Sequence, residues 1–249
     1  MADRPRDPAV SIWVKPPRTR RHGSAPSGLS RERIVRAGVE LLDAQGIAAF
    51  SMRRLATELD VTPMSLYWYV DAKDDLLELA LDDVLGRLDI TPLEDHGDWR
   101  RQLRTLAQEY RRCFQLHPWA AQLAGQFLPL GPNSLLFSNS ATGAIARSGL
   151  PPEQYGAALG LIFEYVYGFV LIESQWLVRV RASGLGEDAF YQVLYGVMRQ
   201  AAPGLADNAD LLASQPRSDQ AAARDLRFTQ GLDLALAGID ARIATAGAH

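Results

Sequence analysis

Apolar side chains recur at helical spacing along most of the chain. The first such stretch places Ile34, Gly38, Leu41 and Leu42 at i, i+4, i+7 and i+8, which is the pattern of one buried helix face. With capping and stop residues as boundaries, the same spacing predicts helices over residues 30–46, 51–59, 62–69, 73–90, 99–117, 118–125, 133–148, 152–181, 187–201 and 219–245. No segment alternates apolar and polar residues as a strand does. The predicted fold class is therefore all-α.

The first 28 residues break this pattern. They contain five prolines and no apolar periodicity, a composition typical of a flexible arm. Residues 1–36 hold nine Lys and Arg against three acidic residues, a net charge of +6, so the remainder must carry −9 of the total charge of −3. A basic end before an acidic body is the pattern of a chain whose one end meets a polyanion.

Two short predicted helices, joined by a turn at Asp60-Val61, follow a longer first helix. This is the layout of a helix-turn-helix, whose last helix enters the major groove of DNA. Ser51 and Thr62 place hydroxyls at two helix N-termini, which suits phosphate, and Arg53 is placed to reach a guanine edge. Once Leu66 points inward, the third helix leaves these residues for DNA: Pro63, Met64, Ser65, Tyr67, Trp68 and Tyr69.

The basic segment Lys15–Arg21 directly precedes this region. We expect it to reach the minor groove or the phosphates through Arg18, Arg20 and Arg21, because a mobile cationic segment is attracted to the DNA backbone; the alternative is a solvated tail. Short helix pairs with polar N-caps also occur in all-α proteins that bind no DNA. The alternative function is thus a helical sensor or scaffold that acts through protein or RNA partners.

Residues 30–78 resemble the DNA-binding domain of the tetracycline-repressor (TetR) family. The resemblance rests on Ser51-Met52-Arg53-Arg54-Leu55-Ala56, on Val61-Thr62-Pro63-Met64-Ser65-Leu66-Tyr67-Trp68-Tyr69-Val70, and on Lys73-Asp74-Asp75. It places Lys73 among the DNA-contacting residues, and Tyr69 stands where the family usually has a histidine. The implied organisation is a basic arm over 1–28, a helix-turn-helix domain over 29–75, and a connecting helix with a ligand-binding and dimerisation domain over 76–249.

Landmarks farther along the chain are similar to the C-terminal domain of actinobacterial branches of that family: His117-Pro118-Trp119, Gly131-Pro132-Asn133, Tyr165-Val166-Tyr167-Gly168, and Phe228 with Gly231-Leu232. The resemblance implies an all-helical dimer with an internal ligand cavity, in which the ligand shifts the spacing of two DNA-reading heads. Residues 99–181 also carry more large aromatic side chains than a small helical layer needs. We predict that an apolar ligand contacts Phe114, Trp119, Phe127, Phe137, Phe163 and Tyr167.

The two longest predicted helices support dimerisation independently. The helix over 152–181 is apolar around much of its circumference, and the last helix has a seam at coiled-coil-like spacing. The predicted interface residues are Leu159, Val166, Val170, Phe228, Leu232 and Ile239. The alternative is that both helices bury these residues within one chain.

Other chemistry has little support in the sequence. Glu109, Cys113 and His117 fall at i, i+4 and i+8, but a lone cysteine on an apolar stripe is usually a core residue. No phosphate-binding glycine loop, nucleophile elbow or metalloprotease motif occurs. Glu164 and Glu173 interrupt the most apolar stretch, so we expect no membrane span; whether they pair structurally or meet the ligand stays open.

The sequence therefore predicts a cytoplasmic homodimer that binds a palindromic operator in double-stranded DNA and leaves it when a small apolar effector binds. It predicts no enzymatic activity, no cofactor, no metal and no membrane partner.

Overall fold

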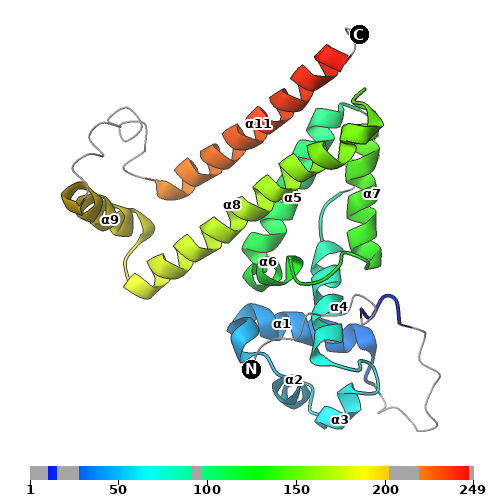
Figure 1. Ribbon diagram of the computed structural model, residues 1–249. Coiled ribbons are helices and arrows are strands. Elements are labelled where there is room, and N and C mark those ends of the chain that lie inside the picture. The colour runs from blue at the N-terminus through cyan, green and yellow to red at the C-terminus, as the bar shows by residue number, and fades with distance from the viewer. Residues whose placement is uncertain (1–10, 16–27, 91–96, 202–218, 247–249) are drawn as a thin grey trace. The chain divides into compact units, whose positions relative to one another are not determined.

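The computed structural model describes residues 11–15, 28–90, 97–201 and 219–246. Within these ranges every regular element is a helix, which confirms the all-α prediction. The elements are α1 (Arg31–Ala49), α2 (Met52–Glu58), α3 (Pro63–Leu66), α4 (Lys73–Leu85), α5 (Trp99–Leu116), α6 (Pro118–Ala124), α7 (Pro132–Ala146), the 3₁₀ turn η3 (Pro152–Gln154), α8 (Tyr155–Ser183), α9 (Glu187–Ala201) and α11 (Gln220–Ala246) (Figure 1).

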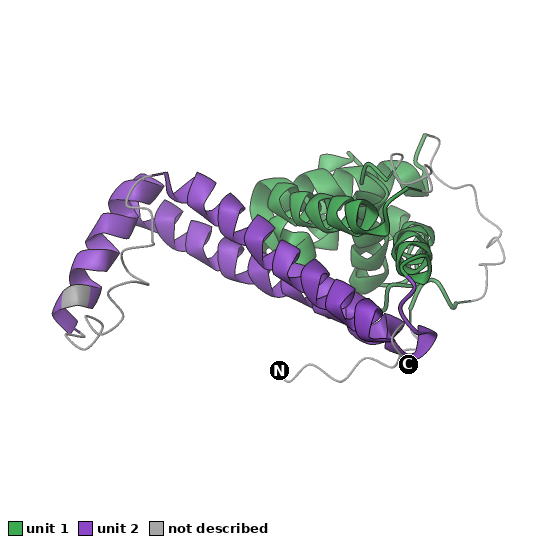
Figure 2. Cartoon of the chain, turned by 90° about the horizontal axis from the view of Figure 1, so that it is seen from above, with its two compact units in different colours: residues 1–148 green, residues 149–249 purple. Residues whose placement is uncertain are grey.

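The chain divides into two compact units, residues 1–148 and 149–249 (Figure 2). Unit 1 contains the predicted helix-turn-helix together with α4 to α7, because α4 packs against α1 on one side and against α6 and α7 on the other. A single core thus continues beyond residue 75, where the sequence placed a domain boundary.

Three predicted helices of unit 1 differ clearly in length from the observed ones, and one of them, predicted over residues 73–90, ends at Leu85. The third helix ends at Leu66 rather than at Tyr69, and 3₁₀-type bonds from the amides of Trp68 and Tyr69 replace its last turn. The first helix is interrupted at Gly46, as predicted, where a φ of 73° leaves the helical region, but one more turn follows up to Ala49. Glycine adopts that φ without a Cβ clash.

Asp82 on α4 ties this helix to the start of α7. Its carboxylate is buried and accepts hydrogen bonds from the amides of Asn133 and Ser134 and from the Ser134 hydroxyl. A carboxylate at a helix N-terminus stabilises the unpaired amides and the positive end of the helix dipole. A Cβ at Gly131 would lie 2.1 Å from Asp82 Oδ1. The glycine of the Gly131-Pro132-Asn133 motif therefore allows Asp82 to approach the start of α7.

A second polar junction joins α1 to α6. Asp43 Oδ1 on α1 lies 2.8 Å from His117 Nδ1 and accepts a 2.7 Å hydrogen bond from Trp119 Nε1. The His117-Pro118-Trp119 motif thus provides two partners for one carboxylate, while Pro118 begins α6 at a position that needs no amide donor.

In unit 2, α11 packs along α8 around an aromatic cluster. Tyr165 stacks on Phe228, and its hydroxyl donates a 3.0 Å hydrogen bond to the Phe228 carbonyl. A Cβ at Gly231 would lie 2.2 Å from that hydroxyl. The glycine therefore lets the tyrosine cross the surface of α11.

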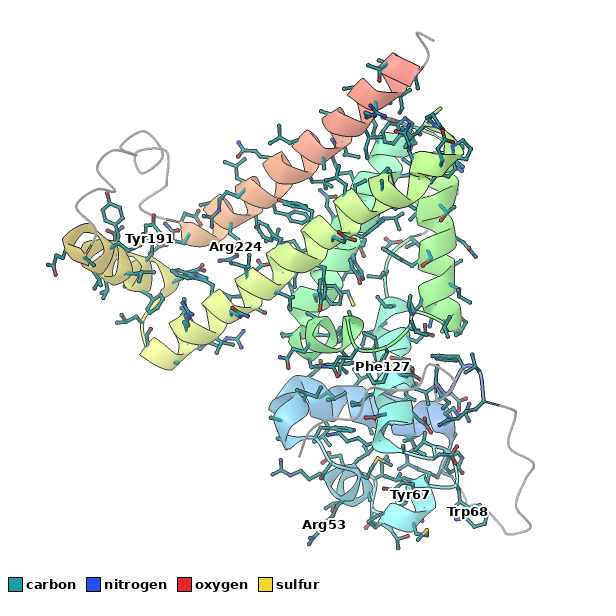
Figure 3. All side chains as sticks on the ribbon, viewed as in Figure 1. Arg53, Tyr67, Trp68, Phe127, Tyr191 and Arg224 are labelled. Atoms are coloured by element: carbon teal, nitrogen blue, oxygen red, sulfur yellow. The ribbon has the colours of Figure 1, made fainter. Side chains whose placement is uncertain are left out.

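Arg224 on α11 joins three helices of unit 2 (labelled in Figure 3). Its guanidinium pairs with Glu173 on α8 at 2.8 Å and with Glu187 on α9. Glu187 also accepts a 2.7 Å hydrogen bond from Trp176 Nε1. The pairing of Glu173 is therefore structural, whereas Glu164 is exposed.

Residues Pro152–Ser183, spanning η3 and α8, are long and apolar enough to cross a membrane by length and composition alone. This criterion allows up to two charged residues in its window, and the two glutamates noted in the sequence, Glu164 and Glu173, lie within the stretch. Since α8 carries the buried ion-paired Glu173 and the packing against α11, its apolar character has a use within the protein.

We predict that Asp82→Ala lowers the free energy of unfolding by about 3 kcal/mol, because it leaves the α7 amides and the Ser134 hydroxyl without their acceptor in a buried site. Urea denaturation followed by circular dichroism measures this loss. The neighbouring Asp83→Ala is the control: the Asp83 side chain is 41% exposed and pairs with Arg87 at i+4, so its loss should cost less than about 0.5 kcal/mol. Equal losses in the two variants would contradict the role of Asp82.

Candidate nucleic-acid interface and cavity

The helix-turn-helix is formed by α2 and α3, which the turn at Asp60-Val61 connects. Ser51 Oγ accepts a hydrogen bond from the Arg54 amide and caps α2. Thr62 precedes Pro63 at the first position of α3, and its hydroxyl is 3.0 Å from that of Ser65. Both residues thus stand at the N-cap position of a helix, but only Ser51 makes a capping hydrogen bond with its side chain.

The predicted contact residues of α3 lie on an open surface. Met64 is 71% exposed, and Tyr67 and Trp68 are also exposed although both are large and apolar. Arg53 on α2 is exposed at the same end of unit 1 (Figure 3). Leu66 is fully buried and fixes α3 against the core, so the outward residues are held on a rigid support.

Three other polar residues of this region have intramolecular partners. The Tyr69 hydroxyl donates a 2.6 Å hydrogen bond to the Leu29 carbonyl. Lys73 Nζ donates to the Phe50 carbonyl and lies 5.4 Å from the centre of the Phe50 ring. Arg54 bonds Gln45 and the Ala49 carbonyl. These contacts fix the helix-turn-helix to α1 and α4, so Tyr69 and Lys73 have structural roles that the sequence did not indicate.

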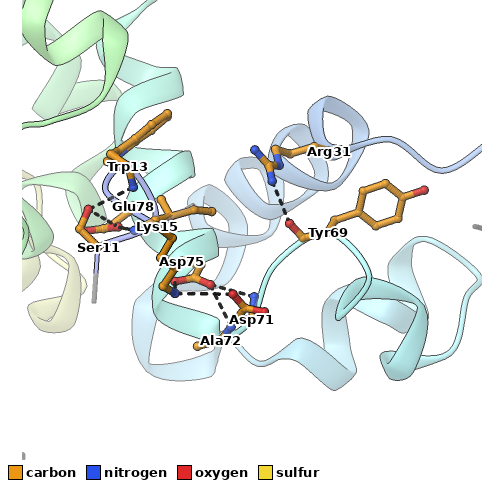
Figure 4. Close-up of polar contacts among 10 residues, drawn as sticks. Ser11, Trp13, Lys15, Arg31, Tyr69, Asp71, Ala72, Asp75 and Glu78 are labelled. Atoms are coloured by element: carbon orange, nitrogen blue, oxygen red, sulfur yellow. Dashed lines mark hydrogen bonds and ion pairs between the residues drawn. The ribbon is translucent and has the colours of Figure 1, made fainter. Parts of the chain in front are cut away.

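Residues 11–15, which we call the strap, lie against α4 (Figure 4). The Ser11 hydroxyl and the Ile12 amide both donate to Glu78 Oε2, at 3.1 and 2.8 Å. Lys15 Nζ is 2.5 Å from Asp75 Oδ1. The prediction of a flexible arm that directs Lys15 to DNA is therefore wrong for this segment, because two buried carboxylates hold it. Arg18, Arg20 and Arg21 lie outside the described residues.

A cavity with a free volume of about 40 Å³ lies within unit 1. Its apolar walls include Leu81 and Leu85 of α4, Tyr110 and Phe114 of α5, and Phe127 from the segment after α6, and Trp13 of the strap also lines it. Two carboxylates, Glu78 and Asp82, reach its edge. An aromatic wall with a few polar groups is the usual composition of a small-molecule site.

Only some of the predicted ligand-contacting residues line this cavity. Phe114 and Phe127 line this cavity. Phe137 stacks on Tyr110 next to it, with ring centres 5.1 Å apart, and Trp119 is 2% exposed and bonded to Asp43 away from the lining. Phe163 and Tyr167 are half-buried on α8 in unit 2.

The predicted dimer residues require a correction. Val166, Val170, Phe228, Leu232 and Ile239 are all buried within the single chain, and Leu159 alone of the six is partly exposed. The seam at coiled-coil spacing thus belongs to the packing of α11 on α8, the alternative that the sequence left open. Other apolar residues of these two helices are exposed: Leu161, Ile172, Val178, Leu226 and Leu234.

Glu109, Cys113 and His117 do not form a common site. Glu109 pairs with Arg112, and His117 bonds Asp43. Burial raises the pKa of the Cys113 thiol to about 12, and its Sγ lies 3.6 Å from the Val84 carbonyl oxygen. Among the described residues, no group of three or more potential metal ligands comes together.

Comparison with known proteins agrees with this architecture. Residues 34–80 match the family model of "Bacterial regulatory proteins, tetR family", and residues 91–243 match "Tetracyclin repressor-like, C-terminal domain". The chain belongs to the tetR family. As a tetR-family protein it is a DNA-binding transcriptional regulator that responds to a ligand, and the alternative of a scaffold acting through protein or RNA partners is set aside.

Three relatives illustrate this membership. An HTH-type transcriptional regulator of Saccharopolyspora erythraea is 40% identical over 166 residues, which is 67% of this chain and 69% of the relative. The Streptomyces coelicolor tetR-family protein ActR, solved in complex with actinorhodin, is 30% identical with a TM-score of 0.71, covering 86% of this chain and 97% of ActR. BioQ with its double-stranded DNA operator is 30% identical with a TM-score of 0.50, covering 59% and 88%.

Sequence reasoning missed Trp13, Glu78 and Asp82 as residues that line the cavity. Trp13 is in a proline-flanked stretch that reads as an arm. The available signal was the unusual Ile12-Trp13-Val14 cluster in an otherwise polar segment, together with acids in α4 at positions where an amphipathic helix would bury apolar residues.

We predict that Arg53→Ala relaxes the base preference at one symmetric pair of operator positions and costs about 1–3 kcal/mol of binding there, with unchanged unfolding. Arg54→Ala is the matched control, because Arg54 bonds within the protein: it should lower the melting temperature and leave the preferred sequence unaltered. Sequence selection from a random DNA pool, with thermal melts of both variants, measures these effects. A uniform loss of affinity in Arg53→Ala would show that Arg53 contacts no base.

Proposed function

We propose that this regulator is a homodimeric repressor that binds an inverted-repeat operator and dissociates when a small molecule enters unit 1. The observation that carries the proposal is the pairing, in one unit, of a rigidly supported helix-turn-helix with an aromatic cavity joined to it by α4. A ligand shifts the equilibrium between the DNA-bound and released conformations only through contacts that differ between them. Ligand-linked release therefore needs the cavity and the helix-turn-helix to be connected by packed structure.

Dimerisation is supported by the exposed apolar residues of α8 and α11. Ile172 is 73% exposed and Leu234 is 75% exposed, and large exposed apolar side chains on packed helices are typical of interaction surfaces. A second copy of the same surface would cover them with two-fold symmetry. Two symmetric heads in turn read two half-sites in opposite orientation.

The effector is proposed to be an aromatic small molecule. ActR, to which this chain is similar, has been solved with actinorhodin bound, and the cavity here is bordered by Tyr110, Phe114 and Phe127. Its free volume of about 40 Å³ is below the roughly 300–1,000 Å³ of a drug-sized site. Binding therefore requires that part of the lining move.

We place the regulator in the cytoplasm, where its operator is, and assign it no catalytic activity. Membership of the tetR family supports both parts of this proposal.

The test begins with the operator. Sequence selection from a random DNA pool with the full chain should yield an inverted repeat with half-site centres separated by about one helical turn or a multiple of it. Adding an effector should lower operator affinity and raise the melting temperature in the same titration. Direct repeats, or no enriched sequence, would overturn the proposal.

We also predict that Arg18, Arg20 and Arg21 contribute to operator binding without reading bases. Their combined replacement by Ala should weaken binding to all sequences and make the salt dependence of log K shallower by up to about 3 units, at about 0.9 per phosphate neutralised. Arg87→Ala, in the turn after α4, controls for the loss of positive charge. Fluorescence anisotropy at several salt concentrations measures the slope, and an unchanged slope would show that these arginines leave DNA untouched.

A further inference from the structure

The strap differs from the rest of the cavity wall in how it is held. The other lining residues lie on α4, α5, α6 and α7 or in the segment between α6 and α7, whereas Trp13 comes from a segment whose partners on α4 are 60 to 67 residues away in sequence. Hydrogen bonds and an ion pair join it to α4: Ser11 and Ile12 bond Glu78, and Lys15 pairs with Asp75. Because residues 11–15 are not part of a helix, the strap can leave without unfolding one.

The strap contributes both an aromatic contact and hydrogen-bond donors to the cavity. Trp13 contributes an indole ring to a wall that already holds Tyr110, Phe114 and Phe127. The Ile12 amide and the Ser11 hydroxyl contribute two hydrogen-bond donors to one oxygen of Glu78. A small molecule with an aromatic ring and a hydrogen-bond donor could make the same two kinds of contact as this peptide segment.

Glu78 restricts what can replace the strap. Its carboxylate is 6% exposed, and a buried carboxylate that loses its donors is strongly destabilising. A ligand that displaces the strap must therefore bring an N–H, O–H or ammonium donor. An anionic ligand would instead place like charges together next to Glu78 and Asp82, which both line the cavity.

We propose that the strap is a built-in occupant of a ligand site, and that the site takes an aromatic molecule carrying an ammonium or N–H donor, which replaces Trp13 and bonds Glu78. This accounts for the small free volume of the cavity, because part of the ligand's space is filled by the chain itself. Its regulatory meaning rests on the proposed function, but the site and its occupant do not depend on DNA.

The first test uses Trp13→Ala in the full chain with two probes that share an indole ring and differ in charge, tryptamine and indole-3-propionate. Isothermal titration calorimetry should show that Trp13→Ala binds tryptamine at least about tenfold more tightly than the unaltered chain, with no such gain for indole-3-propionate. Val14→Ala is the matched control, since Val14 belongs to the strap but is exposed; it should behave as the unaltered chain. Unchanged or weaker tryptamine binding in Trp13→Ala would overturn the proposal.

The second test needs no variant. In the unaltered chain, the Ile12 amide is bonded to Glu78 and should be protected from hydrogen exchange. Saturating tryptamine should remove that protection, whereas indole-3-propionate should leave it in place. Increased protection with tryptamine would mean that the strap closes over the ligand instead of yielding to it, and the proposal would be wrong.

Both measurements are made without DNA, so failure of the proposed ligand site can be distinguished from failure of the proposed function. If the unaltered chain selects no operator but tryptamine still displaces the strap, the proposed function fails and the ligand site stands. If an operator is found but Trp13→Ala gains no tryptamine affinity, the regulator stands and the strap is a fixed part of the wall.

Discussion

Three buried carboxylates on one helix determine how unit 1 is assembled. Asp75, Glu78 and Asp82 lie at i, i+3 and i+7 of α4 and are 3%, 6% and 4% exposed. Since a buried carboxylate is tolerated only with donors around it, each requires a particular partner segment. Asp75 accepts from Lys15 and from the amides before α4, Glu78 from the strap, and Asp82 from the start of α7. The positions of two segments distant in sequence, the strap and the start of α7, thus depend on one helix face.

The same helix connects the two functional parts of this unit. At its first residue, Lys73 bonds the Phe50 carbonyl beside the helix-turn-helix, and farther along, Leu81 and Leu85 form part of the cavity wall. A change at the cavity has a continuous, packed path to the DNA-reading end, with no flexible joint along α4. Packed helices of this kind are one route by which coupling between two sites is carried.

The sequence predicted much of this fold, and its errors share a cause. Helical spacing located nearly every helix, and the exposed α3 residues were predicted because Leu66 had to point inward. Spacing shows that Val166 and Phe228 are buried but does not show whether their own chain or a second copy buries them, so the α8–α11 seam was assigned to a dimer. The strap was missed because its docking depends on Glu78, about 66 residues away, while its local composition is that of an arm. Hydrogen bonds between residues so far apart in sequence produce no periodic pattern of apolar and polar residues.

The burial of that seam within one chain changes what the remaining apolar residues imply. With Val166, Phe228 and Leu232 already covered, α8 and α11 form a stable pair and still present Leu161, Ile172 and Leu234 to solvent. Water contact with those side chains is unfavourable, and the proposed dimerisation would remove it. Under that proposal the folding of unit 2 and its assembly are linked by mass action, so the amount of protein in the cell would itself set how much of it is competent to act.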